Sequence, residues 1–97
     1  MSEFYIKSAK LSASPKETEQ MLRVIVSSFK GRSGVELTAE HEDEVIAAER
    51  FNLSIGENTV DLFIAEASEP RKIMLKLCYR GFPSGSYEAD IPPLNLK

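Results

Sequence analysis

The chain has 97 residues and a mass of 10.8 kDa, which leaves room for one compact domain but not for two. Hydrophobic residues make up 42% and charged residues 28%, a globular composition that excludes a disordered or fibrous chain. No stretch is apolar enough for a membrane span, and the N-terminus lacks the apolar segment of a signal peptide. A single cysteine excludes an internal disulfide, so we expect a reducing, cytoplasmic location.

The net charge of −3 conceals an uneven distribution along the chain. Residues 34–69 contain ten acids and one base, a net charge of −9, whereas the remaining residues sum to +6. Such asymmetry bears on partners and on association rates rather than on the fold.

The N-terminal third predicts a strand followed by a long helix. Residues 3–13 begin with β-prone aromatic and branched side chains, which favour a strand. Ser14, Pro15 and Glu17 have the spacing of a capped helix start, so we expect a helix over 15–30. Its apolar stripe repeats at helical spacing and consists of Met21, Leu22, Ile25, Val26 and Phe29.

Residues 35–51 are compatible with two structures. Apolar and polar residues alternate from Val35 to Glu40, which favours a strand. From Thr38 onward the sequence also suits a capped, Ala-containing helix, so a short second helix near 38–50 remains an alternative. We favour a hairpin that turns near His41–Asp43.

The rest of the chain predicts strands and an irregular end. Residues 51–55 and 59–64 form a strand, a turn and a strand, and 72–80 alternates with one fully apolar face. The expected fold class is therefore α+β, with one long helix packed on an antiparallel sheet of about four to five strands. We expect residues 1–80 to form the single domain and the Pro- and Gly-containing residues 81–97 to form an extended tail.

The sequence contains no motif that points to catalysis. Glycine-rich nucleotide loops, nucleophile elbows and zinc-ligand spacings are absent, so we expect no enzyme, no cofactor and no metal site. The only cysteine, Cys78, is expected to be a packing residue. Lys72, Lys76 and Arg80 share a strand face and offer a nucleic-acid-binding alternative, although Tyr79 has the opposite parity and could not stack on bases there.

The acidic segment is the best candidate for a binding site. On a strand, alternate carboxylates lie about 6.6–6.8 Å apart on one face, whereas a helix would cluster them differently. Either arrangement gives a dense negative surface able to occupy a site that normally binds phosphates. The residues expected to contact the partner are Glu36, Glu40, Glu42, Asp43, Glu44 and Glu49.

A short, motif-free chain with an acidic stretch from Glu36 to Asp61 resembles small phage-encoded inhibitors of bacterial defence, including anti-CRISPR proteins that imitate nucleic acid. In size and charge pattern it also resembles immunity proteins that neutralise basic nuclease toxins. The resemblance implies a non-enzymatic inhibitor whose acidic face, residues 36–61, occupies a basic, nucleic-acid-binding site on a partner protein. The alternative is a small structural or assembly subunit that associates through a sheet edge or through the C-terminal tail.

Overall fold

The computed structural model describes residues 3–12, 19–65 and 67–93, and these residues form strands, turns and loops without any helix. All strand pairs are antiparallel. The strands of the described residues are β1 (Phe4–Ser12), β2 (Glu19–Ser28), β3 (Arg32–His41), β4 (Glu44–Leu53), β5 (Gly56–Ala65), β6 (Arg71–Tyr79) and β7 (Phe82–Ile91).

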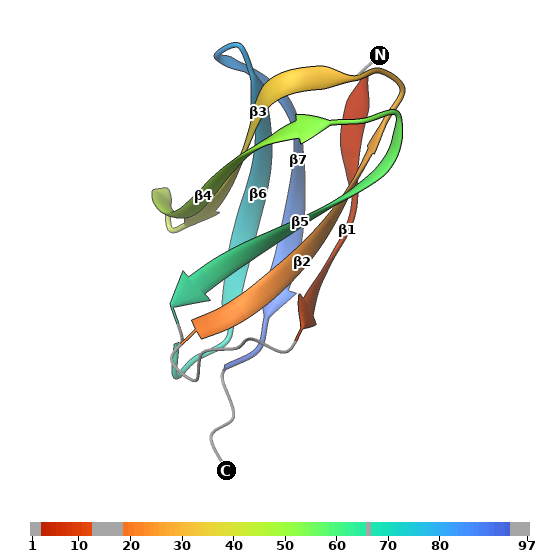
Figure 1. Ribbon diagram of the computed structural model, residues 1–97. Helices are drawn as coiled ribbons and strands as arrows, with labels where there is room; N and C mark the ends of the chain where they lie inside the picture. The colour runs from red at the N-terminus through yellow and green to blue at the C-terminus, as the bar shows by residue number, and fades with distance from the viewer. Residues whose placement is uncertain (1–2, 13–18, 66, 94–97) are drawn as a thin grey trace.

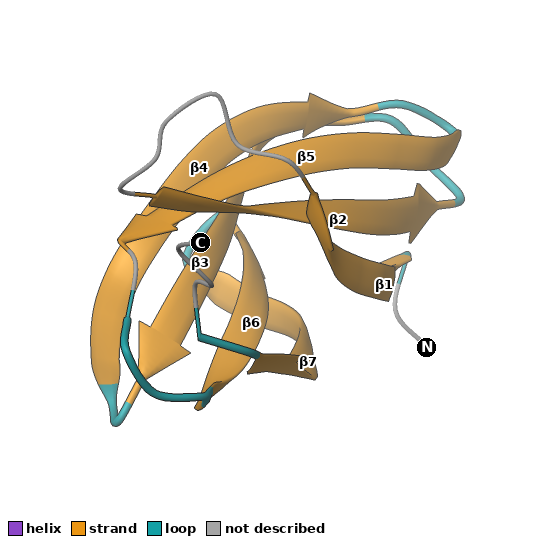
Figure 2. Ribbon diagram, turned by 90° about the horizontal axis from the view of Figure 1, so that it is seen from below, coloured by secondary structure: helices purple, strands orange, loops and turns teal. Residues whose placement is uncertain are grey.

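The strands form two sheets that pack face to face as a β-sandwich (Figures 1 and 2). One sheet has the order β1-β2-β5 and the other has the order β4-β3-β6-β7. Consecutive strands cross between the sheets three times, after β2, β4 and β5, so two of the five pairings, β2 with β5 and β3 with β6, join distant parts of the chain. This is an immunoglobulin-like arrangement in which the fourth strand pairs with the third rather than with the fifth.

The core lies between the sheets and is filled by alternate residues of both. The β1-β2-β5 sheet contributes side chains such as Leu22, Val24 and Leu62, while Leu37 and Leu75 come from the other sheet, and all five are at most 1% exposed. Alternation arises because successive side chains on a strand point to opposite faces.

The predicted helix over 15–30 is wrong, and the fold is all-β rather than α+β. Residues 13–18, with the expected capping signal, lie outside the described residues, and β2 occupies 19–28. The apolar residues of β2 satisfy a helical period only because the strand is apolar on both faces near its start: Met21 is buried on the outer face and Leu22 in the core. The adjacent β-branched residues Val24, Ile25 and Val26 favour extended backbone.

The other expectations were partly confirmed. The hairpin near His41–Asp43 is present, so the alternative helix near 38–50 does not form. The strand over 72–80 is β6, with its apolar face in the core as predicted. The C-terminal segment, expected to be an extended and irregular tail, forms β7 from Phe82 to Ile91 and completes the four-stranded sheet.

The alternation of strand direction sorts the turns into two ends of the molecule (Figure 1). The β2–β3, β4–β5 and β6–β7 connections (residues 29–31, 54–55 and 80–81) lie at one end, here called the apical end. The β3–β4 turn (residues 42–43) is at the opposite, basal end of its strands. The described residues include no helix of the length and apolarity needed to cross a membrane.

Candidate protein-binding surfaces

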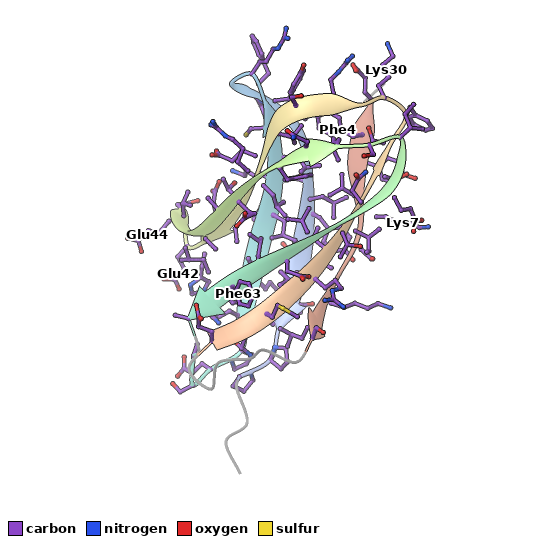
Figure 3. The ribbon with its side chains drawn as sticks, in the orientation of Figure 1. Phe4, Lys7, Lys30, Glu42, Glu44 and Phe63 are labelled. Atoms are coloured by element: carbon purple, nitrogen blue, oxygen red, sulfur yellow. The ribbon has the colours of Figure 1, made fainter. Side chains whose placement is uncertain are left out.

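The β3–β4 turn gathers three carboxylates at the tip of a hairpin. Glu42 and Asp43 form a two-residue turn with φ angles of 52° and 66°, closed by the pair His41 and Glu44. Glu42, Asp43 and Glu44 are all exposed, and the side chains of Glu42 and Glu44 project from the tip (Figure 3). None of these three carboxylates makes an ion pair or hydrogen bond with any other described residue. The acidic tip, as we name Glu42, Asp43 and Glu44, is therefore free to meet a partner.

The remaining predicted carboxylates do not join this tip in one row. Glu36 and Glu40 lie on the outer face of the four-stranded sheet, and Glu40 accepts a hydrogen bond from Lys76 at 3.1 Å. Glu49 pairs in register with Leu37 and so lies on the opposite face of the sheet, where it is exposed. The structure thus brings three of the six candidate residues together at the tip, places Glu40 near them beside Lys76, and separates Glu36 and Glu49 from them.

Two acids further along the segment are also balanced within the molecule. Glu57 pairs with Lys7, and Asp61 accepts two hydrogen bonds from Arg23 at 2.9 and 3.2 Å. These hydrogen bonds lower the pKa of the Asp61 carboxyl below its usual value, since they favour the charged form. Neither acid offers an unpaired charge to a partner.

A shallow groove of about 380 Å³ runs from the acidic tip across the outer face of β6 and β7. Its charged lining consists of Glu40, Glu42, Asp43, Lys72, Lys76 and Glu88. The two lysines are matched by acids, because Lys72 lies 3.6 Å from Glu88 and Lys76 pairs with Glu40. In the described parts of the chain, no three His, Cys, Asp or Glu side chains are grouped so that they could hold a metal ion.

The basic residues of the nucleic-acid alternative are not on one surface. Lys72 and Lys76 lie on the outer sheet face with their acid partners, whereas Arg80 belongs to the β6–β7 turn. The Arg80 guanidinium covers the Tyr79 ring at 5.2 Å from its centroid. Cys78 is partly buried on the outer face, in register with Glu36.

The apical end carries three large apolar side chains that stay in solvent. Phe29, Ile55 and Phe82 are 65%, 76% and 72% exposed; Phe29 and Ile55 lie in the β2–β3 and β4–β5 connections, and Phe82 is the first residue of β7, directly after the β6–β7 connection. The β2–β5 ladder ends at the pair Ser28 and Gly56. Phe29 and Ile55 are the next residues beyond this pair on the two chain segments, so they are neighbours. We call Phe29, Ile55 and Phe82, together with Lys30 and Arg80, the apical face.

Next to the apical face, Tyr79 packs against an aromatic ring and two guanidinium groups. Tyr79 packs edge-to-face on Phe4 with centroids 6.2 Å apart, and the Arg32 guanidinium lies 5.7 Å from the Tyr79 centroid. Arg32 donates hydrogen bonds of 2.7 and 2.6 Å to the two carboxylate oxygens of Glu3. These bonds, followed by the charges of Arg32 and Lys30, lower the pKa of Glu3 against a smaller opposing effect of desolvation.

The sequence alone did not identify the apical face. The sequence pattern places Phe29 in the core stripe of a helix and Ile55 in a strand. One signal was present: Ile55 directly precedes Gly56, Phe82 directly follows Gly81, and Phe29 lies two residues before Gly31. A large apolar residue beside a turn glycine is poorly placed to reach the core.

Comparisons with known proteins support the fold and nothing finer. No protein-family model matches the chain, and no curated protein matches it in sequence. Among solved structures, a β-glucuronidase from glycoside hydrolase family 2 matches 94% of the chain with a TM-score of 0.62 and 11% identity. DesR, a β-glucosidase from Streptomyces venezuelae, matches 93% with a TM-score of 0.51 and 10% identity.

The chain spans only 13% and 15% of those two enzymes, so the likeness is to one small domain within a much longer protein. At such low identity, similarity of structure reports the sandwich architecture and not the activity. Nothing in these comparisons bears on the resemblance to phage-encoded inhibitors.

Proposed function

We propose that this chain is a non-catalytic protein-binding module whose acidic tip docks on a basic surface of a partner protein. Such docking would cover that surface and so block negatively charged ligands of the partner, nucleic acid included. The proposal narrows the expected acidic face from six residues to Glu42, Asp43 and Glu44, with the groove beside them as the flank of the contact.

The observation that supports this proposal most directly is the exposure of three unpaired carboxylates at a strained turn, two within it and one directly after it. Like charges so close repel one another, and positive φ angles at two non-glycine residues add a backbone cost. Local strain of this kind is typical of functional positions. Val45, which follows the tip, is 57% exposed and adds an apolar contact to the charges.

A binding role also fits the chemistry of the described residues better than catalysis does. Neither His41 nor Cys78 forms a hydrogen bond with another titratable side chain of the described residues. Nucleophilic and acid–base catalysis both need such a pair. With one cysteine and no disulfide, the module suits the cytoplasm, and we include that location in the proposal.

Capture experiments with a matched variant test the proposal. The wild-type chain and the triple variant Glu42→Gln, Asp43→Asn, Glu44→Gln are immobilised and exposed to a lysate of the source organism at low and high salt. A protein retained by the wild type in low salt and lost with the triple variant is the expected result, because surface charge pairs are screened by salt.

The control variant removes the same number of charges elsewhere, by Glu49→Gln, Glu69→Gln and Asp90→Asn. These residues are exposed and lie outside the acidic tip. The control should retain the partner, because net charge is then matched and only position differs. Equal binding by the wild type and the tip variant would contradict the proposal.

A second candidate function, a small assembly subunit, is favoured by the apical face. Three exposed apolar side chains at one end of the sandwich, two of them neighbours, favour a surface that a partner covers. The C-terminal tail was expected to mediate assembly, but its residues 82–91 form β7 within the sandwich and are not available for that contact.

A further inference from the structure

Hydrogen bonds fix the two apical connections that carry Phe29 and Ile55. The Asn58 side chain accepts from the Ser54 amide at 2.9 Å and donates to the Ser54 carbonyl at 2.9 Å, which fixes the β4–β5 connection on both sides of Ile55. In the β2–β3 connection, the Ser28 hydroxyl accepts from the Lys30 amide, and the Phe29 amide donates to the Glu3 carbonyl at 2.9 Å. Because these bonds fix the two connections before a partner binds, less conformational entropy is lost on docking.

The apical face also has positive charge that its neighbours do not neutralise. Glu3 is already bound by Arg32, and Glu57 is already paired with Lys7. Lys30 and Arg80 make no ion pair with a described residue. An occupant of this face must therefore supply carboxylates together with an apolar contact.

The chain itself carries a surface of that chemistry at its other end. The acidic tip presents three unpaired carboxylates and the exposed side chain of Val45, and β3 and β4 place it away from the apical end (Figure 3). We propose that copies of this chain associate end to end, with the acidic tip of one copy docked on the apical face of the next. This inference rests on the proposed docking role of the tip and names its partner as a second copy.

The size of the two surfaces sets the expected strength. Three large apolar side chains, each about two-thirds to three-quarters exposed, offer roughly 400 Å² if each has about 200 Å² in full. A stable interface buries about 800 Å² on each partner, so this contact is weak and depends on concentration. Because the two surfaces differ, the contact is head-to-tail and extends into chains rather than closing as a symmetric pair.

Nucleic acid is a less suitable occupant of the apical face. Only Lys30 and Arg80 are available to neutralise phosphates, and Ile55 beside Phe29 cannot stack on a base. A protein surface with carboxylates and a small apolar group matches all five residues.

Two variants that each disable one end test the proposal by complementation. The tip variant is Glu42→Gln, Asp43→Asn, Glu44→Gln, and the apical variant is Phe29→Ser, Lys30→Glu in the loop after β2. The apical control, Leu11→Ser with Lys10→Glu, makes the same chemical changes at exposed positions of β1 away from the apical end. Circular dichroism and thermal melting establish that every variant is folded before association is measured.

Sedimentation velocity over a range of concentrations in low salt gives the readout. We expect the wild type and the apical control to sediment faster as concentration rises, and each end variant alone to remain a monomer. An equimolar mixture of the two end variants should form dimers and nothing larger, because each supplies the end that the other lacks. High salt should weaken the mixed dimer at least about tenfold, as charge pairs at its edge are screened.

Three results would overturn the inference: a wild type that stays monomeric at every concentration, a mixture that stays monomeric, or a tip variant that still associates by itself. A single-stranded oligonucleotide bound by the wild type and not by the apical variant, without self-association, would assign the face to nucleic acid instead. If the wild type does not self-associate but still captures another protein through the acidic tip, this inference is wrong and the proposed function stands.

Discussion

The β3–β4 turn contains backbone strain that substitution should relieve. Type I′ hairpin turns need positive φ at both central residues, and Asn-Gly or Asp-Gly normally occupies them. The β6–β7 turn follows this pattern, with Arg80 at φ 52° and Gly81 at φ 79°, whereas Glu42 and Asp43 at φ 52° and 66° include no glycine. The double substitution Glu42→Asn, Asp43→Gly should therefore stabilise the fold.

The expected gain follows from the cost of the left-handed conformation. That conformation costs a residue with a Cβ atom about 1–2 kcal/mol, and Asp and Asn tolerate it best. Glycine at position 43 removes the clash but loses about 0.5–1 kcal/mol of chain entropy on folding, so most of the gain comes from position 42. We expect about 1 kcal/mol in total, which raises the Tm of a domain of this size by about 4–8 °C.

Thermal melting and urea denaturation, both followed by far-UV circular dichroism, measure the effect. Glu44→Gln is the control, because it removes a charge of the same acidic tip from a residue that lies in β4 and not in the turn. The double variant should raise the urea midpoint at unchanged m-value. An unchanged or lower midpoint, or an equal gain from Glu44→Gln, would show that charge repulsion and not backbone conformation limits this turn.

Other contacts make further predictions. Arg71→Met should destabilise the fold by about 1–3 kcal/mol and lower the urea midpoint, because it deprives the buried Gln20 side chain of the hydrogen bond that Arg71 donates at 2.9 Å. Asp61→Asn should lower the free energy of unfolding at neutral pH, and this difference from the wild type should disappear in acid. The Arg23 hydrogen bonds lower the pKa of Asp61 in the folded state. The stabilisation that they supply is therefore present above the usual pKa of 3.8 and is lost as the pH falls through the folded-state pKa. Urea titrations of both proteins from pH 7 into acid test this, and a constant difference at all pH values would contradict it. Tyr79→Leu should cost about 1 kcal/mol more than Tyr79→Phe by thermal melting, because only Phe retains a ring for the two guanidinium groups at 5.7 and 5.2 Å.

Local patterns in the sequence predicted those strands that have one polar and one apolar face. In β6, the fully buried residues Ile73, Leu75 and Leu77 alternate with the less buried residues Lys72, Met74, Lys76 and Cys78. The same logic failed for β2, which lies in the middle of its sheet and is apolar on parts of both faces. A strand of that kind has no two-residue period, so its apolar residues also satisfy a helical period.

The sandwich itself depends on contacts that a local pattern does not contain. β2 pairs with β5, and β3 pairs with β6, across at least 28 residues of sequence, the separation of the pair Ser28 and Gly56. The turn near His41–Asp43 was predictable because its signal is local, and so was the acidic character of the tip. The pairing of Glu40 with Lys76 was not, since it required the register of β3 against β6.

The charges that are unevenly distributed along the sequence are largely paired on the sheet faces of the fold and unpaired at its two ends. Acids of the −9 segment meet bases of the +6 remainder on neighbouring strands, as in Asp61 with Arg23 and Glu40 with Lys76. Cross-strand pairs of this kind leave little net charge on the outer sheet faces. Among the described residues, unpaired charges of both signs remain on the strands, for example Glu36, Glu49 and Arg50, whereas each end gathers unpaired charge of one sign: negative at the acidic tip and positive at Lys30 and Arg80. A partner selected by charge should therefore bind an end of the sandwich, and neutralising the sheet-face residues in pairs should leave its affinity unchanged.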